Sequence, residues 1–296
     1  MLSRREFLAA ATTLTASSVL AEDSAPEPVI DIHQHTNYSG RTDEQLLAHQ
    51  RAMGVTTTVL LPAGKYYGLD AQCGGNDSCA SVVERLPKEF VRFANEVPYL
   101  GEAKEVITKS LKSGAIGIGE QKFRVLSDST HLGKIADIAQ EFNVPVLLHF
   151  WDGDYNMEFA RFYKTLEKYP KVNFIGHAQS WWANIDKNNK PGTLYPKGPV
   201  TPGGITDRYL SDYANMFGDL SAGSGLGAIL RDEEHFKGFM VRHQDKLMYG
   251  SDCNDTLGRG PGCQGAQTLA AVRRLAPTKA IERKLLYGNA KKLLRL

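Results

Sequence analysis

Val29-Ile30-Asp31-Ile32-His33-Gln34-His35 begins as an apolar strand and ends in two histidines. A first strand of this kind can open either a closed (β/α)8 barrel or an open doubly wound sheet. The open sheet usually carries a glycine-rich turn directly after its first strand, where it binds a dinucleotide. No glycine cluster follows this strand, so the segment favours the barrel.

Seven further strand-like segments alternate with helical patterns along the chain. These apolar segments cover residues 55–61, 90–95, 115–123, 144–150, 172–176, 216–220 and 247–250. The helical patterns cover residues 42–53, 81–86, 103–111, 132–142, 157–169, 209–214, 233–242, 267–275 and 280–294, and the polar residues 181–204 are expected to form a functional loop. Eight strands in roughly 270 residues match a TIM barrel in size. We therefore expect an α/β fold, a single-domain (β/α)8 TIM barrel over residues 29–296.

The composition excludes several classes of protein. The chain has 296 residues, of which 42% are hydrophobic and 23% are charged, as in ordinary globular proteins rather than disordered ones. The chain has 35 Lys and Arg residues and 33 Asp and Glu residues. This balance leaves no excess of positive charge of the kind that binds nucleic acid. No apolar run reaches the ~18–20 residues of a membrane span. We expect a small-molecule substrate, no nucleic-acid partner and no stable membrane anchor; a homodimer stays open.

Residues 1–21 have the pattern of an export signal. Ser3-Arg4-Arg5-Glu6-Phe7-Leu8 fills every named position of Ser-Arg-Arg-x-Phe-Leu and resembles a twin-arginine signal peptide, with a cleavage site after Ala21. Residues 22–28 contain two prolines and are expected to be a flexible lead-in. The twin-arginine export machinery is therefore an expected partner, and the periplasm is the expected location.

Four cysteines lie in the chain: Cys73, Cys79, Cys253 and Cys263. Disulfides persist in the periplasm, and two close pairs in glycine-rich segments favour bridges 73–79 and 253–263. Free or cross-paired thiols remain the alternative. Neither pair has the short spacing of a four-cysteine zinc site.

Polar residues gather where the predicted strands end. They are His33, His35, Glu120, Lys122, His149, His177 and Asp252. His33 and His35 are two apart on a strand and share a face, and Glu120 and Lys122 share parity with Ile116 and Ile118. In a barrel these strand ends open on one mouth, where burying His and Asp costs several kcal/mol unless they are paired or bound to a cation. Imidazole and carboxylate suit Zn²⁺ or another divalent metal ion.

This arrangement resembles the amidohydrolase superfamily over nearly all of residues 29–296. The likeness is strongest to amidohydrolase family 2, a branch that includes aminocarboxymuconate semialdehyde decarboxylase and lactone hydrolases. It rests on the strand-end histidines and on the segments Asp31-Ile32-His33-Gln34-His35, Tyr249-Gly250-Ser251-Asp252 and Gly288-Asn289-Ala290-Lys291-Lys292-Leu293-Leu294. The resemblance implies that His33, His35, His149 and Asp252 bind a metal. It also implies that His177 assists the reacting water or binds a second ion.

The resemblance leaves the number of ions open. Many superfamily members bridge two ions with a carboxylated lysine after the fourth strand, and others use a glutamate there. Here Glu120 and Lys122 are both expected to face inward, and either could supply the bridge. One ion is favoured over two, because the best-known members of family 2 use one.

Substrate-binding residues are predicted less directly. Arg124 could hold a substrate carboxylate or be a solvated surface residue, and Lys122 is a further candidate. Aromatic residues in the mouth-side loops should line a pocket for a planar substrate or pack those loops together. They are Tyr66, Tyr67, Trp151, Trp181 and Trp182. Histidines away from strand ends are expected at the surface or at helix caps: His49, His131, His235 and His243.

The expected activity is a hydrolase that uses metal-activated water on a small ester, lactone or amide. Asp252 would take the proton of the water and His177 would donate to the developing oxyanion. The same ligands would serve a decarboxylase or hydratase of an unsaturated carboxylic acid. A periplasmic ligand-binding protein without turnover is the second alternative. The export signal favours the hydrolase, and the intact ligand set argues against the binding protein.

Overall fold

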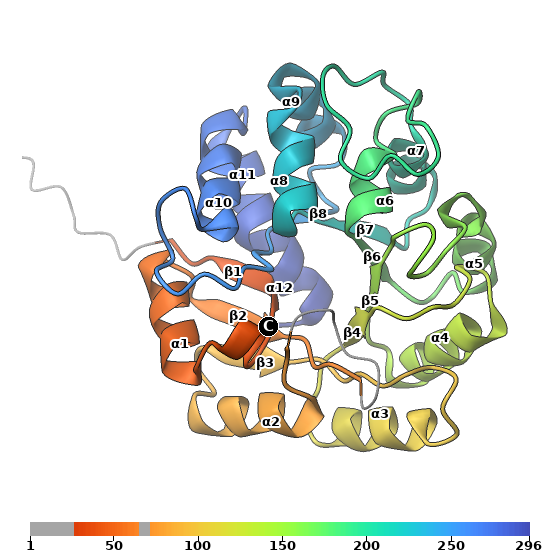
Figure 1. Ribbon diagram of the computed structural model, residues 1–296, viewed down its shortest axis with the longest axis vertical. Helices are drawn as coiled ribbons and strands as arrows, with labels where there is room; N and C mark the ends of the chain where they lie inside the picture. Colours follow the sequence, from red (N-terminus) through yellow and green to blue (C-terminus); the bar gives the residue numbers. More distant parts are fainter. Residues whose placement is uncertain (1–26, 65–71) are drawn as a thin grey trace, which may run out of the picture.

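A computed structural model of the chain describes residues 27–64 and 72–296. Within these residues, short strands run parallel to one another and form the inner layer of the fold. They are β1 (Ile30–Gln34), β2 (Thr57–Leu60), β3 (Phe90–Arg92), β4 (Ile118–Gln121), β5 (Val146–His149), β6 (Phe174–His177), β7 (Met216–Asp219) and β8 (Leu247–Met248). Figure 1 shows a ring of helices around these strands. Each predicted strand is present, with bounds that differ from the predicted ones by a few residues.

Backbone hydrogen bonds close the strands into a barrel. The strands pair in the orders β1-β2-β3 and β4-β5-β6-β7-β8. The seam between β3 and β4 is joined by Ala94 N–H, which donates to Gly117 O over 2.8 Å. The seam between β8 and β1 is joined by Ile32 N–H to Tyr249 O at 3.1 Å, and by Asp252 N–H to His33 O at 2.9 Å. The predicted TIM barrel is confirmed, and its last seam directly joins two candidate metal ligands.

The helices follow the predicted order, with two additions. They are α1 (Asp43–Ala52), α2 (Asn76–Arg85), α3 (Ala103–Lys112), α4 (Thr130–Phe142), α5 (Tyr163–Lys168), α6 (Gln179–Ala183), α7 (Ile205–Asp212), α8 (Ala222–Leu230), α9 (Glu233–Arg242), α10 (Gln264–Leu275), α11 (Lys279–Arg283) and α12 (Asn289–Leu294). The helices α6 and α8 were not predicted from the sequence. Three glycines make α8 a poor helix by propensity, and its packing against α6 and α10 holds it. Among the described residues, none of these helices has the length and apolarity needed to cross a membrane.

An inner apolar cluster fills the barrel below its polar mouth. It consists of Ile30, Ile32, Val59, Leu61, Phe93, Leu147, Ile175, Met248, Ala290 and Leu294. Two of these residues come from the C-terminal helix α12, which Figure 1 shows near the middle of the ring. On β1, β5 and β6 the apolar residues precede the histidines along the strand. The histidines at the mouth of the barrel therefore lie next to this apolar cluster.

Strict alternation of side chains fails in two strands. The pairing of β1 with β2 shifts register between Asp31 and Gln34, and that of β4 with β5 shifts between Ile118 and Gln121. Ile118 consequently lies in the outer core between strands and helices, whereas Ile116 packs on the inner cluster. The expectation that Ile116 and Ile118 share a face is therefore wrong.

The predicted disulfides are also wrong, because all four cysteines are free thiols. Cys79 is buried in an apolar cluster under α2, where its Sγ lies 3.8 Å from Thr36 Oγ1. The Sγ atoms of Cys253 and Cys263 are 3.7 Å apart, far beyond the ~2.05 Å of a disulfide.

The close packing of β6 predicts the effect of one substitution. A Cβ at Gly176 would overlap the ring of Trp181, whereas a Cβ at Gly227 in α8 would meet nothing within 4 Å. Gly176→Ala should lower the free energy of unfolding by about 1–3 kcal/mol through overpacking. Gly227→Ala should raise it by about 0.5–1 kcal/mol through helix propensity. Urea unfolding followed by circular dichroism measures both, and equal stability of the two variants would contradict this packing.

Candidate metal centre

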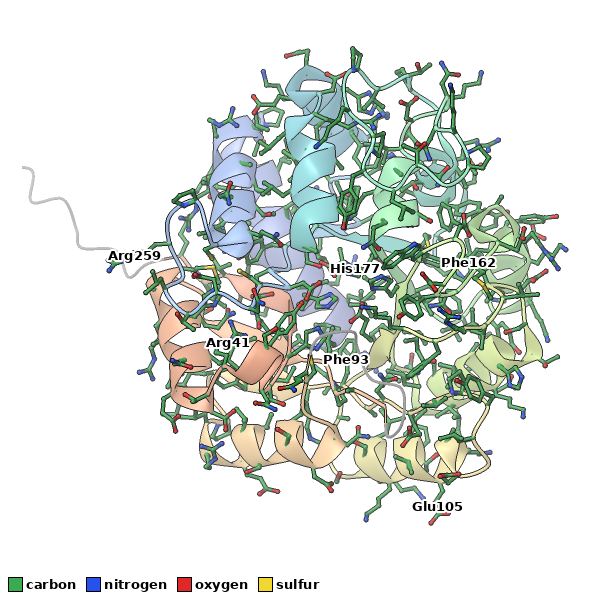
Figure 2. The ribbon with its side chains drawn as sticks, viewed as in Figure 1. Arg41, Phe93, Glu105, Phe162, His177 and Arg259 are labelled. Carbon is green, nitrogen blue, oxygen red and sulfur yellow. The ribbon has the colours of Figure 1, made fainter. Side chains whose placement is uncertain are left out.

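Six of the predicted side chains meet where the strands end at the mouth of the barrel. They are His33, His35, Glu120, His149, His177 and Asp252, contributed by β1, β4, β5, β6 and the segments directly after β1 and β8. Figure 2 shows His177 near the middle of the ring. All of these side chains are buried except that of Asp252, which is 12% exposed. Asp252 therefore has the most direct access to solvent.

The first group of donor atoms surrounds one oxygen of Glu120. The Nε2 atoms of His33 and His35 each lie 3.6 Å from Glu120 Oε2. The same nitrogens lie 3.8 and 3.5 Å from Asp252 Oδ1. Ligand atoms bound at about 2.0–2.2 Å to one ion lie roughly 3–3.6 Å from one another. These four atoms thus have close to the spacing of a coordination shell.

The second group faces the other oxygen of Glu120. Glu120 Oε1 lies 3.7 Å from His177 Nε2 and 2.5 Å from His149 Nδ1. His177 Nε2 is also 3.6 Å from Asp252 Oδ2. The Glu120 carboxylate consequently stands between two sets of imidazole nitrogens, with one oxygen directed to each set.

Several of these atoms have no hydrogen-bond partner although they are buried. They are His33 Nε2, His177 Nε2 and Asp252 Oδ1. A buried polar atom without a hydrogen-bond partner lowers the stability of the fold by about 1–3 kcal/mol, and three such atoms at one place are unusual. Divalent cations bound at this place would satisfy all three atoms, so the residues present fit a metal site. His149 differs, because its Nδ1 contacts Glu120 and its Nε2 lies 3.1 Å from Gln179 Oε1.

Outer hydrogen bonds orient the imidazole rings. His33 Nδ1 lies 2.7 Å from Asp219 Oδ2, and His35 Nδ1 lies 2.8 Å from Leu61 O. His177 Nδ1 lies 2.9 Å from Ser221 Oγ, which in turn donates to Asp219 Oδ2. An Nδ1–H held by an acceptor leaves Nε2 as a lone-pair donor directed into the site, as metal-binding histidines require.

Asp219 and Ser221 were not predicted from the sequence as site residues. Asp219 is fully buried at the end of β7, so it carries the same strand-end signal that identified His149 and His177. Ser221 follows it by two residues, and its N–H donates to Asp219 Oδ1 at 3.0 Å. Applying the strand-end criterion to residues 216–220 would have found Asp219.

The ionisable groups of the site perturb one another strongly. Burial alone would lower the pKa of His33, but the nearby carboxylates, Asp252 first, hold it well above its ordinary value. Burial and the charge of His33 lower the pKa of His177 to about 4. Burial would raise the pKa of Glu120, but His149 and His33 hold it well below its usual range. Without an ion, a protonated His33 therefore neutralises part of the carboxylate charge, and a cation can take that place.

Asp252 and Tyr38 form the solvent side of the site. Asp252 has a φ of +41°, in the left-handed region that non-glycine residues rarely adopt and that is found at functional sites. The charge of Asp252, followed by burial, raises the pKa of the Tyr38 phenol. The Tyr38 ring also meets His35 edge-on, with centroids 5.0 Å apart. Tyr38 was not predicted, although its position three residues after His35 was a signal available in the sequence.

Some of the expected substrate-binding residues lie near the mouth. Trp151 is half-buried, with its ring centroid 6.4 Å from that of His149. The Tyr155 ring packs against the rings of both His149 and Trp151, with centroids 5.6 and 5.9 Å apart. Lys122 Nζ lies 5.3 Å from the centroid of the Tyr155 ring. These residues form an aromatic wall with one positive charge beside His149.

Other expected substrate-binding residues lie elsewhere. Trp181 is fully buried against Phe150 and Phe159, so the expectation that it contacts substrate is wrong: the ring fills the outer core. Trp182 is buried in the same way. The side chain of Arg124 is 72% exposed and pairs with Asp154 at 2.6 Å, as expected of a surface arginine. Tyr66 and Tyr67 lie outside the described residues.

Two histidines expected at the surface or at helix caps are buried instead. His243 has its Nε2 2.5 Å from Asp207 Oδ1, a contact that gives this buried nitrogen a polar partner. His49 is fully buried on α1, with its Nε2 3.3 Å from Cys263 Sγ. His131 and His235 are only partly buried.

Comparison with known proteins places the chain at the level of fold. No protein-family model and no curated protein matches it. An uncharacterised TIM-barrel protein from Bordetella bronchiseptica has 12% identity and a TM-score of 0.62, with 91% of this chain and 99% of that chain covered. A probable 2-pyrone-4,6-dicarboxylic acid hydrolase from Acinetobacter baumannii has 14% identity and a TM-score of 0.60, over 90% and 99%. A dihydroxybenzoic acid decarboxylase from Polaromonas sp. JS666, with bound manganese and an inhibitor, has 15% identity and a TM-score of 0.56, over 91% and 97%. The chain thus shares the TIM-barrel fold of these proteins over nearly its whole length.

Proposed function

We propose that this protein is an exported metal-dependent hydrolase that acts on a small ester, lactone or amide. The observation that carries the proposal is the set of buried donor atoms without partners on His33, His177 and Asp252. A bound divalent ion would lower the pKa of a water and polarise a substrate carbonyl. The hydrolase from Acinetobacter baumannii and the manganese-bound decarboxylase from Polaromonas support this at the level of fold.

The position of Glu120 favours two ions over the single ion expected from the sequence. His33, His35 and Asp252 would hold one ion together with Glu120 Oε2, whose distances to the two histidines are both 3.6 Å. His177 Nε2, 3.7 Å from Glu120 Oε1, would hold the second ion together with that oxygen, and His149 would join them by exchanging its 2.5 Å contact with Glu120 for the ion. A shared carboxylate offsets the repulsion between two such ions. Of the two residues expected to bridge the ions, Lys122 lies beside Tyr155. Glu120 is the residue whose carboxylate stands between the two sets of histidines.

The residues of the chain divide the remaining work. Asp252 directs Oδ1 toward His33 and His35, while its Oδ2 can accept the proton of the attacking water and return it to the leaving group. Tyr38 places its phenol beside the Asp252 carboxylate and its ring edge-on to His35. Trp151 and Tyr155 offer a flat apolar wall beside His149, suited to a ring-bearing substrate.

A decarboxylase of an aromatic or unsaturated acid is the second candidate. The aromatic wall and the positive charge of Lys122 suit a planar carboxylic acid, and one neighbour of the same fold is a dihydroxybenzoic acid decarboxylase. Such a reaction would use Asp252 to deliver a proton to carbon rather than to a leaving group.

The first prediction from this proposal concerns turnover. The purified, metal-loaded protein should hydrolyse at least one member of a panel of lactones, esters and amides. A chelator should abolish the activity and added divalent metal should restore it. Asp252→Asn should lower kcat by about 10²–10⁴-fold by removing the proton acceptor, whereas Asp245→Asn, at a carboxylate that is 74% exposed, should have no effect.

The same assay separates the alternatives. Carbon dioxide release from hydroxybenzoates without hydrolysis of the panel would replace the hydrolase by the decarboxylase. Tight binding of a panel member with no turnover would replace both by a binding protein.

The second prediction concerns Glu120. If its carboxylate is shared between two ions, Glu120→Gln should bind one equivalent of metal fewer than the wild type, measured by elemental analysis of the purified protein. Glu84→Gln, at an exposed residue of α2, is the matched control and should bind as many ions as the wild type. An unchanged content in a folded Glu120→Gln variant, verified by circular dichroism, would sink the two-ion account.

Export by the twin-arginine route rests on the sequence pattern alone, since residues 1–26 lie outside the described part of the chain. Replacing Arg4 and Arg5 together by Lys should leave folded protein in the cytoplasm, measured by cell fractionation. Glu6→Gln changes the unrestricted position of the pattern and should export normally. Normal periplasmic amounts of the double variant would show that the signal has been misinterpreted.

A further inference from the structure

A second cluster of metal-ligating side chains lies outside the candidate metal centre. It consists of His49 on α1, Cys253 after β8, and Cys263 at the start of α10, all of which are buried. The two Sγ atoms are 3.7 Å apart, and His49 Nε2 lies 3.3 Å from Cys263 Sγ. The resemblance and the proposed hydrolase chemistry use none of these three residues.

These two distances, 3.7 and 3.3 Å, are close to the spacing of ligands in a tetrahedral metal site. Zinc binds thiolate sulfur at about 2.3 Å and imidazole nitrogen at about 2.0–2.1 Å, which separates tetrahedral ligands by roughly 3.4–3.8 Å. A disulfide would instead require the two sulfurs to lie about 2.05 Å apart. We propose that His49, Cys253 and Cys263 form a second metal site, for zinc or a similarly thiophilic divalent ion.

The carboxylate of Asp255 is the fourth ligand that we propose for this site. Asp255 is on the same loop as Cys253, and its Oδ2 lies 3.9 Å from His49 Nε2 and accepts hydrogen bonds from the N–H groups of Leu257 and Gly258. Binding the ion replaces the two thiol protons, which leave to solvent, so the site then holds two thiolates and one carboxylate. The N–H of Ala266 donates to Cys263 Sγ at 3.3 Å and stabilises a thiolate there.

A buried arginine balances the remaining charge. Arg41 donates through Nη1 to the carbonyl oxygens of Cys253 and Asp255, at 2.8 and 2.9 Å. The ion and Arg41 together neutralise the two thiolates and the carboxylate, which lowers the cost of burying them. In Figure 2, Arg41 lies on the side of the ring formed by β1 and α1.

The site ties the loop after β8 to helix α1. Cys253 directly follows Asp252, and Cys263 begins α10, so an ion there anchors both ends of this loop. The loop already packs tightly on α1, because a Cβ at Gly258 would overlap the carbonyl oxygen of His49. The ion bound by His49, Cys253 and Cys263 therefore has a structural role beside the proposed active site, because it holds the segment that carries Asp252.

Cobalt(II) gives a direct spectroscopic test, because thiolate ligands produce a charge-transfer band in the near ultraviolet. The metal-free protein is kept reduced and titrated with cobalt(II). Wild type and His33→Ala should both show the band, since the candidate metal centre has no sulfur donor in its proposed shell. Cys263→Ser should lose the band and bind one equivalent of zinc fewer than the wild type.

Matched variants keep this test decisive. Cys73→Ser should retain both the band and the metal content. Burial, and then the charges of Asp252 and Glu120, raise the pKa of its thiol, so Cys73 lies near the metal centre and this variant excludes ligation by Cys73 there. His49→Gln leaves both thiols in place and should weaken cobalt binding at this site at least tenfold, which tests the site even if Cys263→Ser fails to fold.

Three outcomes would overturn the proposal. The first is a cobalt-loaded wild type without a thiolate band. The second is a band that disappears in Cys73→Ser and survives in Cys263→Ser. The third is a titration of the denatured, unreduced wild type that finds two thiols fewer than the reduced protein, while Cys263→Ser shows no such difference.

Discussion

A single carboxylate, that of Glu120, is held out of water between four imidazole rings, and the mouth of the barrel is organised around it. Isolated burial of such a charge would cost many kcal/mol. The cost is met by the 2.5 Å contact with His149 and by the positive charge on His33. Each of the four histidines approaches one of its two oxygens. This arrangement is stable only if the rings cannot turn away, which the surrounding structure ensures.

The barrel supplies that rigidity through its last seam. Asp31, fully buried on β1, accepts hydrogen bonds from the N–H groups of His33 and Ser251, at 3.0 and 2.9 Å. These bonds add to the direct bond from Asp252 N–H to His33 O. β1 and the segment after β8 are therefore joined at the residues that carry the first set of donors. Asp219 and Ser221 extend the same network to His33 and His177 from β7.

Much of this arrangement could be predicted from the sequence, because parallel strands in a barrel bring their carboxyl ends together. Strand order and the polar residues at strand ends were sufficient to gather His33, Glu120, His177 and Asp252. What the sequence could not supply was the local departure from regular pairing. The register shifts in β1 and β4 change which residues face inward. The consecutive residues Ile32 and His33 consequently both face the inside of the barrel, Ile32 in the inner apolar cluster and His33 in the polar mouth.

Other errors arose where tertiary packing overrides local signals. Trp181 follows a strand that ends in a histidine, and this position predicted contact with substrate. Gly176, which has no side chain, instead leaves room for the Trp181 ring in the outer core. Helix α8 forms despite its glycines because its neighbours bury it. His49 gave no sign of burial in the sequence, since its partners Cys253 and Cys263 lie about 200 residues away along the chain.

The central claim is that the polar mouth of this barrel holds divalent ions around Glu120. Anomalous X-ray scattering from crystals of the zinc-loaded protein, recorded on both sides of the zinc absorption edge, tests it most directly. We predict one peak among His33, His35 and Asp252 and a second between His149 and His177, with Glu120 between them. A zinc-loaded crystal without an anomalous peak within bonding distance of these side chains would contradict the account.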